Sequence, residues 1–159
     1  MKLIALVIEE YGDLFKNEIL SFSTKYKVHF DFKDGFLRVC KNDEALEDFY
    51  GNRISGITAI VGENGVGKTQ ILNILGQRLI ERDNITIDGR YFMLYLTDEN
   101  LIIEVRNVNV VSISLFNRRA IEINSIDKPS NLRYYNYFVN LDKNIENINK
   151  IIEITEKFK

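Results

Sequence analysis

The first third of the chain alternates apolar and polar residues with the two-residue period of β-strands. Residues 26–32 alternate in this way, residues 33–35 (Lys-Asp-Gly) form a turn sequence, and residues 36–40 resume the strand pattern. This order predicts a β-hairpin, because glycine tolerates the positive φ of a tight turn. Residues 2–8 predict another strand, whereas residues 42–50 are acidic and polar without a clear period and predict a loop or a single helical turn.

The pattern changes twice near the middle of the chain. Residues 57–61 (Ile-Thr-Ala-Ile-Val) form a short, almost wholly apolar run, which predicts a strand buried on both faces. Residues 68–82 then adopt the period of an amphipathic helix. The expected apolar stripe of this helix consists of Ile71, Leu72, Leu75, Leu79 and Ile80. We therefore expect a buried strand that leads directly into a helix.

The second half of the chain returns to the β pattern. Turn sequences separate four expected strands, which fit an antiparallel meander and lie at residues 91–96, 101–105, 108–115 and 120–126. Residues 132–139 predict an aromatic-rich strand. Residues 141–158 predict a C-terminal helix, because their apolar residues follow a helical spacing.

The composition is that of one globular domain. The chain has 159 residues, of which 45% are hydrophobic and 28% charged, and this balance excludes a disordered tail. We expect a single domain over residues 1–159. Its expected parts are an N-terminal β region (1–56), a strand and helix (57–82), an antiparallel β region (84–126), and a strand with a C-terminal helix (132–158).

The charge and the cysteine content limit the classes of partner and the cell compartment that we expect for this protein. The formal net charge of −2 provides no global field that would attract nucleic acid or an anionic membrane. Cys40 and His29 are the single cysteine and the single histidine, which excludes an internal disulfide and a zinc cage built from thiols and imidazoles. No apolar run reaches the length of a signal peptide core or a membrane span, so we expect a cytoplasmic protein without a membrane partner.

One glycine-rich segment matches a known sequence motif for phosphate binding. It reads Gly62-Glu63-Asn64-Gly65-Val66-Gly67-Lys68-Thr69 and matches G-x-x-x-x-G-K-[ST], the Walker A phosphate-binding loop. Glycines let the backbone N–H groups of such a loop turn toward a polyphosphate, and the following helix N-terminus adds further donors. Lys68 would reach the β- and γ-phosphates, and the Thr69 hydroxyl would bind Mg²⁺. The alternative is a glycine-rich turn with a surface lysine; the expected flanking strand and helix favour nucleotide binding.

The wider segment resembles one branch of the P-loop proteins. Residues 60–75 resemble the G-x-N-G-x-G-K-[ST]-x-L-L-x-x-L version of ABC-type ATPases, in particular the SMC, RecF and overcoming-lysogenization-defect group of AAA family ATP-binding proteins. The Asn64-Gly65 pair is the distinguishing detail. The resemblance implies an α/β fold: a P-loop NTPase whose ABC-type N-terminal lobe carries an antiparallel β subdomain and few helices. The resemblance extends to individual residues over residues 57–75. Elsewhere it concerns only the expected order of strands and helices.

The resemblance also implies a set of site residues. Residues 62–69 match the phosphate cradle, Gln70 follows them, and ATP with Mg²⁺ is the implied cofactor. The family stacks an aromatic side chain on adenine from the β region before the loop. The candidates for this contact are Tyr11, Phe15, Phe22 and Tyr26, each of which is more readily explained by packing.

Hydrolysis in such enzymes requires a carboxylate pair, a signature loop and a switch histidine. Asp98 and Glu99 follow an apolar run and are the candidate catalytic pair, although a hairpin turn explains them better. The chain has no signature sequence, and His29 lies upstream of the loop, where an exposed strand position is expected.

The leading hypothesis is an ATP-binding domain of an ABC/SMC-like ATPase that associates with a second copy or a second ATPase half, with hydrolysis dependent on segments absent from this chain. The alternatives are a small P-loop kinase and a non-hydrolysing, nucleotide-gated interaction module. DNA is implied as a partner by resemblance alone. A local basic patch at Arg118, Arg119 and Arg133 is better explained as a solvated surface.

Overall fold

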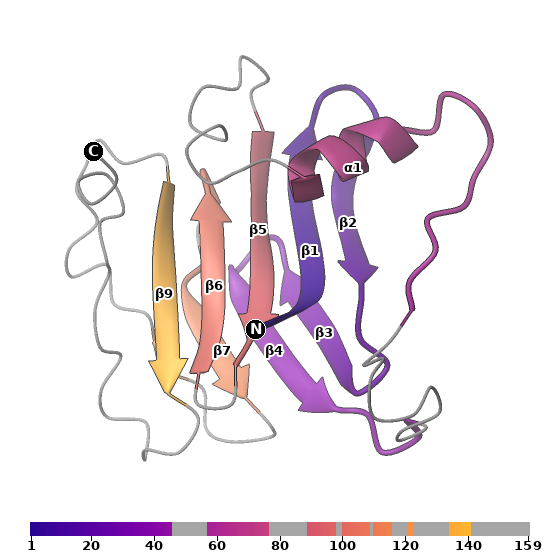
Figure 1. Cartoon of the computed structure of the whole chain (residues 1–159). Coiled ribbons are helices and arrows are strands. Elements are labelled where there is room, and N and C mark those ends of the chain that lie inside the picture. Colours follow the sequence, from indigo (N-terminus) through magenta and orange to yellow (C-terminus); the bar gives the residue numbers. More distant parts are fainter. Residues whose placement is uncertain are drawn as a thin grey trace, which may run out of the picture.

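The computed structural model of the chain contains two β-sheets and one helix within its described residues (Figure 1). The described residues are 1–45, 57–76, 89–97, 100–108, 110–115, 121–122 and 134–140.

Sheet A has five strands in the order β2-β1-β5-β6-β9, and every neighbouring pair is antiparallel. The strands are β1 (Lys2–Tyr11), β2 (Phe15–Ser21), β5 (Gly89–Leu96), β6 (Asn100–Arg106) and β9 (Tyr134–Asn140). β1 lies between β2 and β5, and its residues Ile4 to Ile8 are all buried. A continuous apolar run at this position is explained by packing layers on both faces of the sheet.

Sheet B has four strands in the order β3-β4-β7-β8. They are β3 (Tyr26–Asp31), β4 (Phe36–Lys41), β7 (Ser112–Leu115) and β8 (Ile121–Glu122). β3 and β4 form the hairpin expected from the sequence, and Gly35 in its turn has a φ of 66°. The Gly35 carbonyl accepts a hydrogen bond from the Val111 N–H at 2.8 Å, which brings the chain alongside β4 before β7 pairs with it in parallel.

The main hydrophobic core lies between the two sheets. Phe30 of β3 meets Phe92 of β5 edge-on, with ring centroids 4.9 Å apart. Around this contact pack Ile4, Ala5, Val7, Leu37, Val39, Leu94, Leu101, Ile103, Val105, Val108, Val110 and Ile113. Burial of each large aliphatic or aromatic side chain contributes about 1.5–3 kcal/mol, so this core is the principal source of stability.

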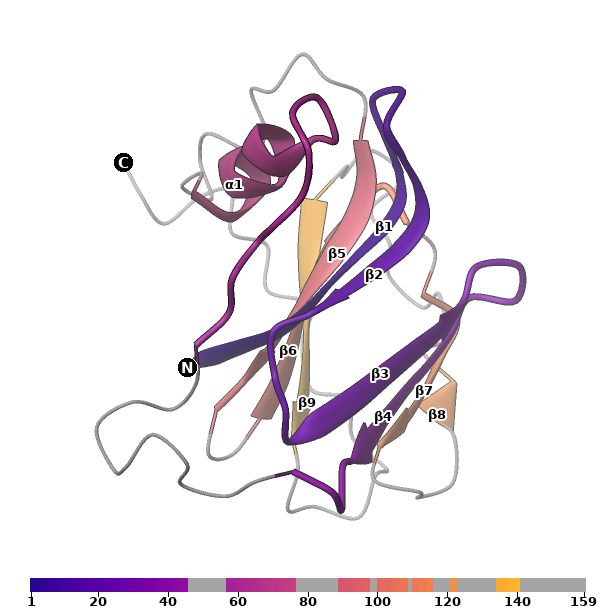
Figure 2. The same cartoon turned by 90° about the vertical axis from the view of Figure 1, so that its right-hand side faces the viewer.

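A second core joins the helix to the opposite face of sheet A. α1 (Lys68–Gly76) buries Ile71 and Ile74 against this face. The sheet contributes Leu6, Ile8, Tyr11, Phe15, Tyr91 and Met93. Figure 2 shows the resulting three layers, with α1 on one side, sheet A in the middle and sheet B on the other side. Within the described part of the chain, no helix is long and apolar enough to cross a membrane.

The expected α/β fold is wrong. The described residues form antiparallel and mixed sheets with one short helix, and no sheet contains the apolar run at residues 57–61. Ile57 is 64% exposed and Val61 is 88% exposed, so this run is not a strand buried on both faces. An apolar run becomes such a strand only when other strands pair with its backbone. Here the described strands pair among themselves in sheets A and B. The glycine-rich loop at residues 62–69 therefore does not follow a central strand of an α/β sheet.

Several element predictions are confirmed and others are wrong. The strand expected at residues 2–8 is confirmed within β1, and those at 91–96 and 101–105 are confirmed within β5 and β6. The strand at 132–139 is confirmed in its described part as β9. The antiparallel meander is wrong, because β5 and β6 lie in sheet A whereas β7 and β8 lie in sheet B. β2 was not expected.

The helix prediction is confirmed over residues 68–76, and its remainder lies outside the described residues. Its expected apolar stripe is wrong at Leu72, which is 57% exposed, whereas Ile74 is fully buried. The C-terminal helix expected at 141–158 lies outside the described residues.

Candidate functional site

The glycine-rich segment forms a loop that leads into α1 beside the turn between β1 and β2 (Figures 1 and 2). Its last glycine lies directly against this turn. A Cβ atom at Gly67 would stand 2.5 Å from Phe15 Cζ and 3.4 Å from Leu14 Cδ1. Because Phe15 belongs to the core beneath α1, the loop is fixed to sheet A at this point.

Two glycines set the path of the loop. Gly65 has a φ of 87° and Gly67 a φ of 89°, both in the left-handed region. A residue with a Cβ atom adopts this region at a cost of roughly 1–2 kcal/mol. The alternating backbone lets successive N–H groups face one side of the loop, which is the arrangement of an anion-binding concavity.

The backbone donors of the loop are not used within the protein. In the described structure, no backbone N–H of residues 63–70 donates to a protein acceptor. The first helical bond runs from the Ile71 N–H to the Gly67 carbonyl at 3.1 Å. The loop and the first turn of α1 therefore offer their N–H groups to solvent or to a ligand, and the positive end of the helix dipole lies at the same place.

The Lys68 ammonium group crosses the loop. Its Nζ donates to the Gly62 carbonyl at 2.7 Å and to the Glu63 carbonyl at 2.6 Å. These partners are neutral dipoles rather than a carboxylate. An ammonium held in this way can exchange carbonyl oxygens for phosphate oxygens, which would form stronger, charge-assisted bonds.

Two side chains follow the lysine. Thr69 is exposed at the start of α1, where its hydroxyl is open to a metal ion carried by a phosphate group. Gln70 turns its amide toward the β1–β2 turn, because a Cβ at Gly12 would lie 3.7 Å from Gln70 Nε2. Gln70 Oε1 is buried and has no hydrogen-bond partner among the residues that the structure describes. Gln70 therefore presents its backbone N–H, and not its amide, to the loop.

The aromatic residues considered for adenine stacking are packed in the two cores. Tyr11 and Phe15 are buried beneath α1, Phe22 packs against the same core, and Tyr26 packs against the core between the sheets. Leu14, in the described turn between β1 and β2 beside the loop, has 52% of its surface exposed. Sequence reasoning missed it because a leucine in a turn carries no pattern of its own.

The environment of Tyr11 changes its acidity. Burial raises the pKa of the Tyr11 phenol above its usual 10.0, the neighbouring Tyr91 raises the pKa further, and Arg106 lowers it. The Tyr11 and Tyr91 rings meet edge-on with centroids 5.9 Å apart, and the Arg106 guanidinium lies 5.9 Å from the Tyr91 ring centroid. This cluster is structural, since it lies within the core that supports α1.

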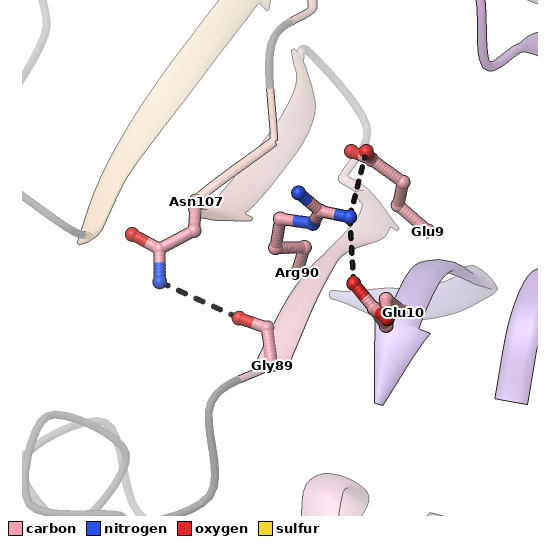
Figure 3. Close-up of polar contacts among 5 residues, drawn as sticks. All are labelled: Glu9, Glu10, Gly89, Arg90 and Asn107. Carbon is pink, nitrogen blue, oxygen red and sulfur yellow. Dashed lines mark hydrogen bonds and ion pairs between the residues drawn. The ribbon is translucent and has the colours of Figure 1, made fainter. Parts of the chain in front are cut away.

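Figure 3 shows a polar cluster where β1 approaches the start of β5. The Arg90 guanidinium donates to Glu10 Oε2 at 2.6 Å and lies 3.4 Å from Glu9 Oε1. Asn107 Nδ2 donates to the Gly89 carbonyl at 3.5 Å. These contacts join the ends of three strands of sheet A, and at their exposure the ion pairs contribute at most about 1 kcal/mol.

Of the other candidate residues, only His29 is among those that the structure describes. Asp98, Glu99, Arg118, Arg119 and Arg133 lie outside the described residues. His29 occupies the exposed strand position expected for it, on β3 in sheet B. Among the described residues, no group of three or more His, Cys, Asp or Glu side chains is arranged to hold a metal ion.

Comparisons with known proteins identify no family for this chain. No protein-family model, no curated protein and no solved structure matches the chain.

Proposed function

We propose that this protein binds MgATP through residues 62–70. The observation that carries the proposal is the open loop. Within the described part of the chain its backbone N–H groups have no protein acceptor. They adjoin the N-terminus of a helix whose first residue, Lys68, extends its ammonium group across the loop. A polyphosphate supplies the oxygens that such a set of donors requires.

Each part of the loop has a separate role in this proposal. The backbone N–H groups would bind phosphate oxygens, and the absence of a Cβ atom at Gly65 keeps the approach open. Lys68 would leave the Gly62 and Glu63 carbonyls and pair with the phosphates. The Thr69 hydroxyl would hold the magnesium ion, which neutralises the charge of the bound triphosphate.

The proposal concerns binding rather than turnover. Hydrolysis requires further groups, and the carboxylates considered for it lie outside the described residues. The resemblance of the loop to that of ABC and SMC-like ATPases supports ATP as the nucleotide, and association with a second copy or a second ATPase half remains part of the proposal. The cytoplasm, where MgATP is abundant, is the proposed compartment.

Calorimetric titration tests the proposal. We expect MgATP to bind the wild type and the Lys16→Ala variant equally, since Lys16 is an exposed lysine of β2, and to bind Lys68→Ala at least about tenfold more weakly. The Thr69→Ala variant should bind ATP in EDTA like the wild type but lose the gain that magnesium provides. The proposal is wrong if neither ATP nor GTP binds the folded wild type with magnesium, or if Lys68→Ala binds normally.

A further inference from the structure

The face of sheet B that points away from sheet A carries cationic side chains on adjacent strands. In the antiparallel pair of β3 and β4, His29 lies opposite Arg38. Lys27 precedes His29 by two residues and so shares its face. All three side chains are exposed. Figure 2 shows no described helix or strand covering this side of sheet B.

Two described carboxylates lie near these side chains, Asp31 on the same face of β3 and Glu44 beside Lys27. The Asp31 carboxylate, on the same strand, accepts hydrogen bonds from the Lys33 and Asp34 N–H groups at 2.9 and 3.1 Å and is committed to the turn. Lys27 forms one exposed ion pair with Glu44 at 3.8 Å, which contributes little. No carboxylate of the described residues pairs with Arg38. Lys27 and Arg38 are therefore available to a bound anion on this face.

An aromatic ring adjoins the cations. Phe36 lies two residues before Arg38 on the same face of β4, and the Arg38 guanidinium lies 5.5 Å from the Phe36 ring centroid. Ser112 of β7 stands opposite Phe36 and adds a hydroxyl to the same row. Phe36 and Arg38 together form a flat, cationic surface of the kind on which nucleobases stack.

The dimensions of the face favour an extended ligand. Residues two apart on a strand lie about 7 Å from each other, and neighbouring strands lie about 4.8 Å apart. The cations are therefore spread over several positions, whereas a small anion would require them to converge on one point. An acidic peptide would use the cations but would have no use for the stacking surface.

We propose that the outer face of sheet B, formed by Lys27, His29, Phe36 and Arg38, binds single-stranded nucleic acid. Lys27, His29 and Arg38 contact the phosphodiester backbone, and Phe36 with the Arg38 guanidinium stacks a base. This site lies on the opposite side of the molecule from α1 and its loop, and it is independent of the proposed nucleotide site (Figure 2).

Fluorescence anisotropy with a labelled oligouridylate of about twenty nucleotides, long enough for one site, tests the proposal in the absence of ATP. The wild type should bind, with an affinity that falls as salt rises. Arg38→Gln and Lys27→Gln should each reduce the slope of log K against log salt by about 0.7, the value for one phosphate contact to a single strand. Phe36→Leu, which keeps an apolar side chain, should weaken binding about tenfold without changing the slope.

The control is Lys16→Gln, which removes an exposed lysine of sheet A and should bind like the wild type. The proposal is overturned if the oligouridylate does not bind at low salt, or if Arg38→Gln and Phe36→Leu bind like the wild type while keeping its circular dichroism. It is also overturned if polyglutamate competes as well as the oligonucleotide does, or if duplex binds as tightly as the single strand. Because no ATP is present, failure here leaves the test of the loop unaffected.

Discussion

Gly65 and Gly67 share a left-handed backbone but differ in their surroundings. A Cβ at Gly65 would meet no described atom within 4 Å, whereas a Cβ at Gly67 would overlap the Phe15 ring. The first position therefore requires glycine for its φ alone. The second requires glycine for its φ and for the close approach between the loop and the β1–β2 turn.

This difference predicts a graded series of alanine variants. Gly65→Ala should lower the free energy of unfolding by about 1–2 kcal/mol, the cost of a left-handed alanine. Gly67→Ala should lower it by about 2–5 kcal/mol, because the displacement of Phe15 adds an overpacking cost of about 1–3 kcal/mol. Gly76→Ala, at the end of α1 with no described atom within 4 Å of its Cβ position, is the control and should be neutral or slightly stabilising. Urea unfolding measures all three, and equal losses for Gly65→Ala and Gly67→Ala would contradict the contact with Phe15.

The raised pKa of Tyr11 predicts a loss of stability in alkali. Below about pH 10, the phenol is protonated in both the folded and the unfolded chain. As the pH rises past 10, the unfolded chain releases this proton first, so the free energy of unfolding falls until the pH passes the folded pKa. Tyr11→Phe removes this contribution. Between about pH 9 and 11, the variant should therefore lose less stability than the wild type in urea unfolding; parallel losses would show that Tyr11 titrates normally.

The periodic pattern of α1 predicts that the segment is a helix better than it predicts which side of the helix is buried. Its period distinguishes a helix from a strand, but the face that packs depends on the direction from which the sheet approaches. The helix meets sheet A through Ile71 and Ile74, and Leu72 points away. The stripe expected from the sequence included Leu72 and omitted Ile74.

The two residues of α1 therefore form a matched pair for substitution. Ile74→Ala should cost about 2–5 kcal/mol in the free energy of unfolding, because it leaves a cavity beneath the helix. Leu72→Ala removes a side chain of equal size from an exposed position and should change stability by no more than about 0.5 kcal/mol. Thermal or urea unfolding distinguishes the two. A large loss for Leu72→Ala would mean that another part of the protein covers the outer face of α1.

Strand predictions succeeded where the deciding signal is local. The β3–β4 hairpin follows from alternation around a turn glycine, and β1, β5 and β6 follow from compact apolar or alternating runs. β2 was missed because it opens with three exposed polar residues after Phe15, and Asn17 within it has a positive φ. The failure at residues 57–61 has a different cause, since burial of an apolar run depends on distant strands that its own sequence does not specify.

For the molecule as a whole, the order in which the strands pair was the least predictable feature. The glycine-rich loop at residues 62–69 was the most predictable one. The parallel pairing of β4 with β7 joins segments that are far apart in the sequence, and no short pattern encodes it. The glycine-rich motif, in contrast, carries its residue types and spacing within eight consecutive positions. Among the described residues its backbone amides have no protein acceptor, and Lys68 Nζ donates to the Gly62 and Glu63 carbonyls. The loop geometry was therefore foreseeable even though the surrounding fold was not.

β1 links the loop to the stability of the whole molecule, because it contributes to both cores. Ile4, Ala5 and Val7 pack between the sheets, whereas Leu6 and Ile8 pack beneath α1. A ligand bound at the loop stabilises α1 and the β1–β2 turn, and both are anchored on β1. We therefore expect nucleotide binding to protect the whole fold and not only the loop.

Ligand-dependent thermal unfolding tests this coupling. A ligand present at 100 times its dissociation constant stabilises the folded state by about 2.7 kcal/mol. For a chain of this size, each kcal/mol raises the melting temperature by about 2–4 °C, so saturating MgATP should raise it by about 5–10 °C. Lys68→Ala should lose most of this shift, whereas Leu72→Ala should retain it, since its side chain lies on the outer face of the same helix. A shift of the same size in Lys68→Ala would assign the stabilisation to another site, and ligand protection confined to α1 in hydrogen exchange would show that the two cores unfold separately.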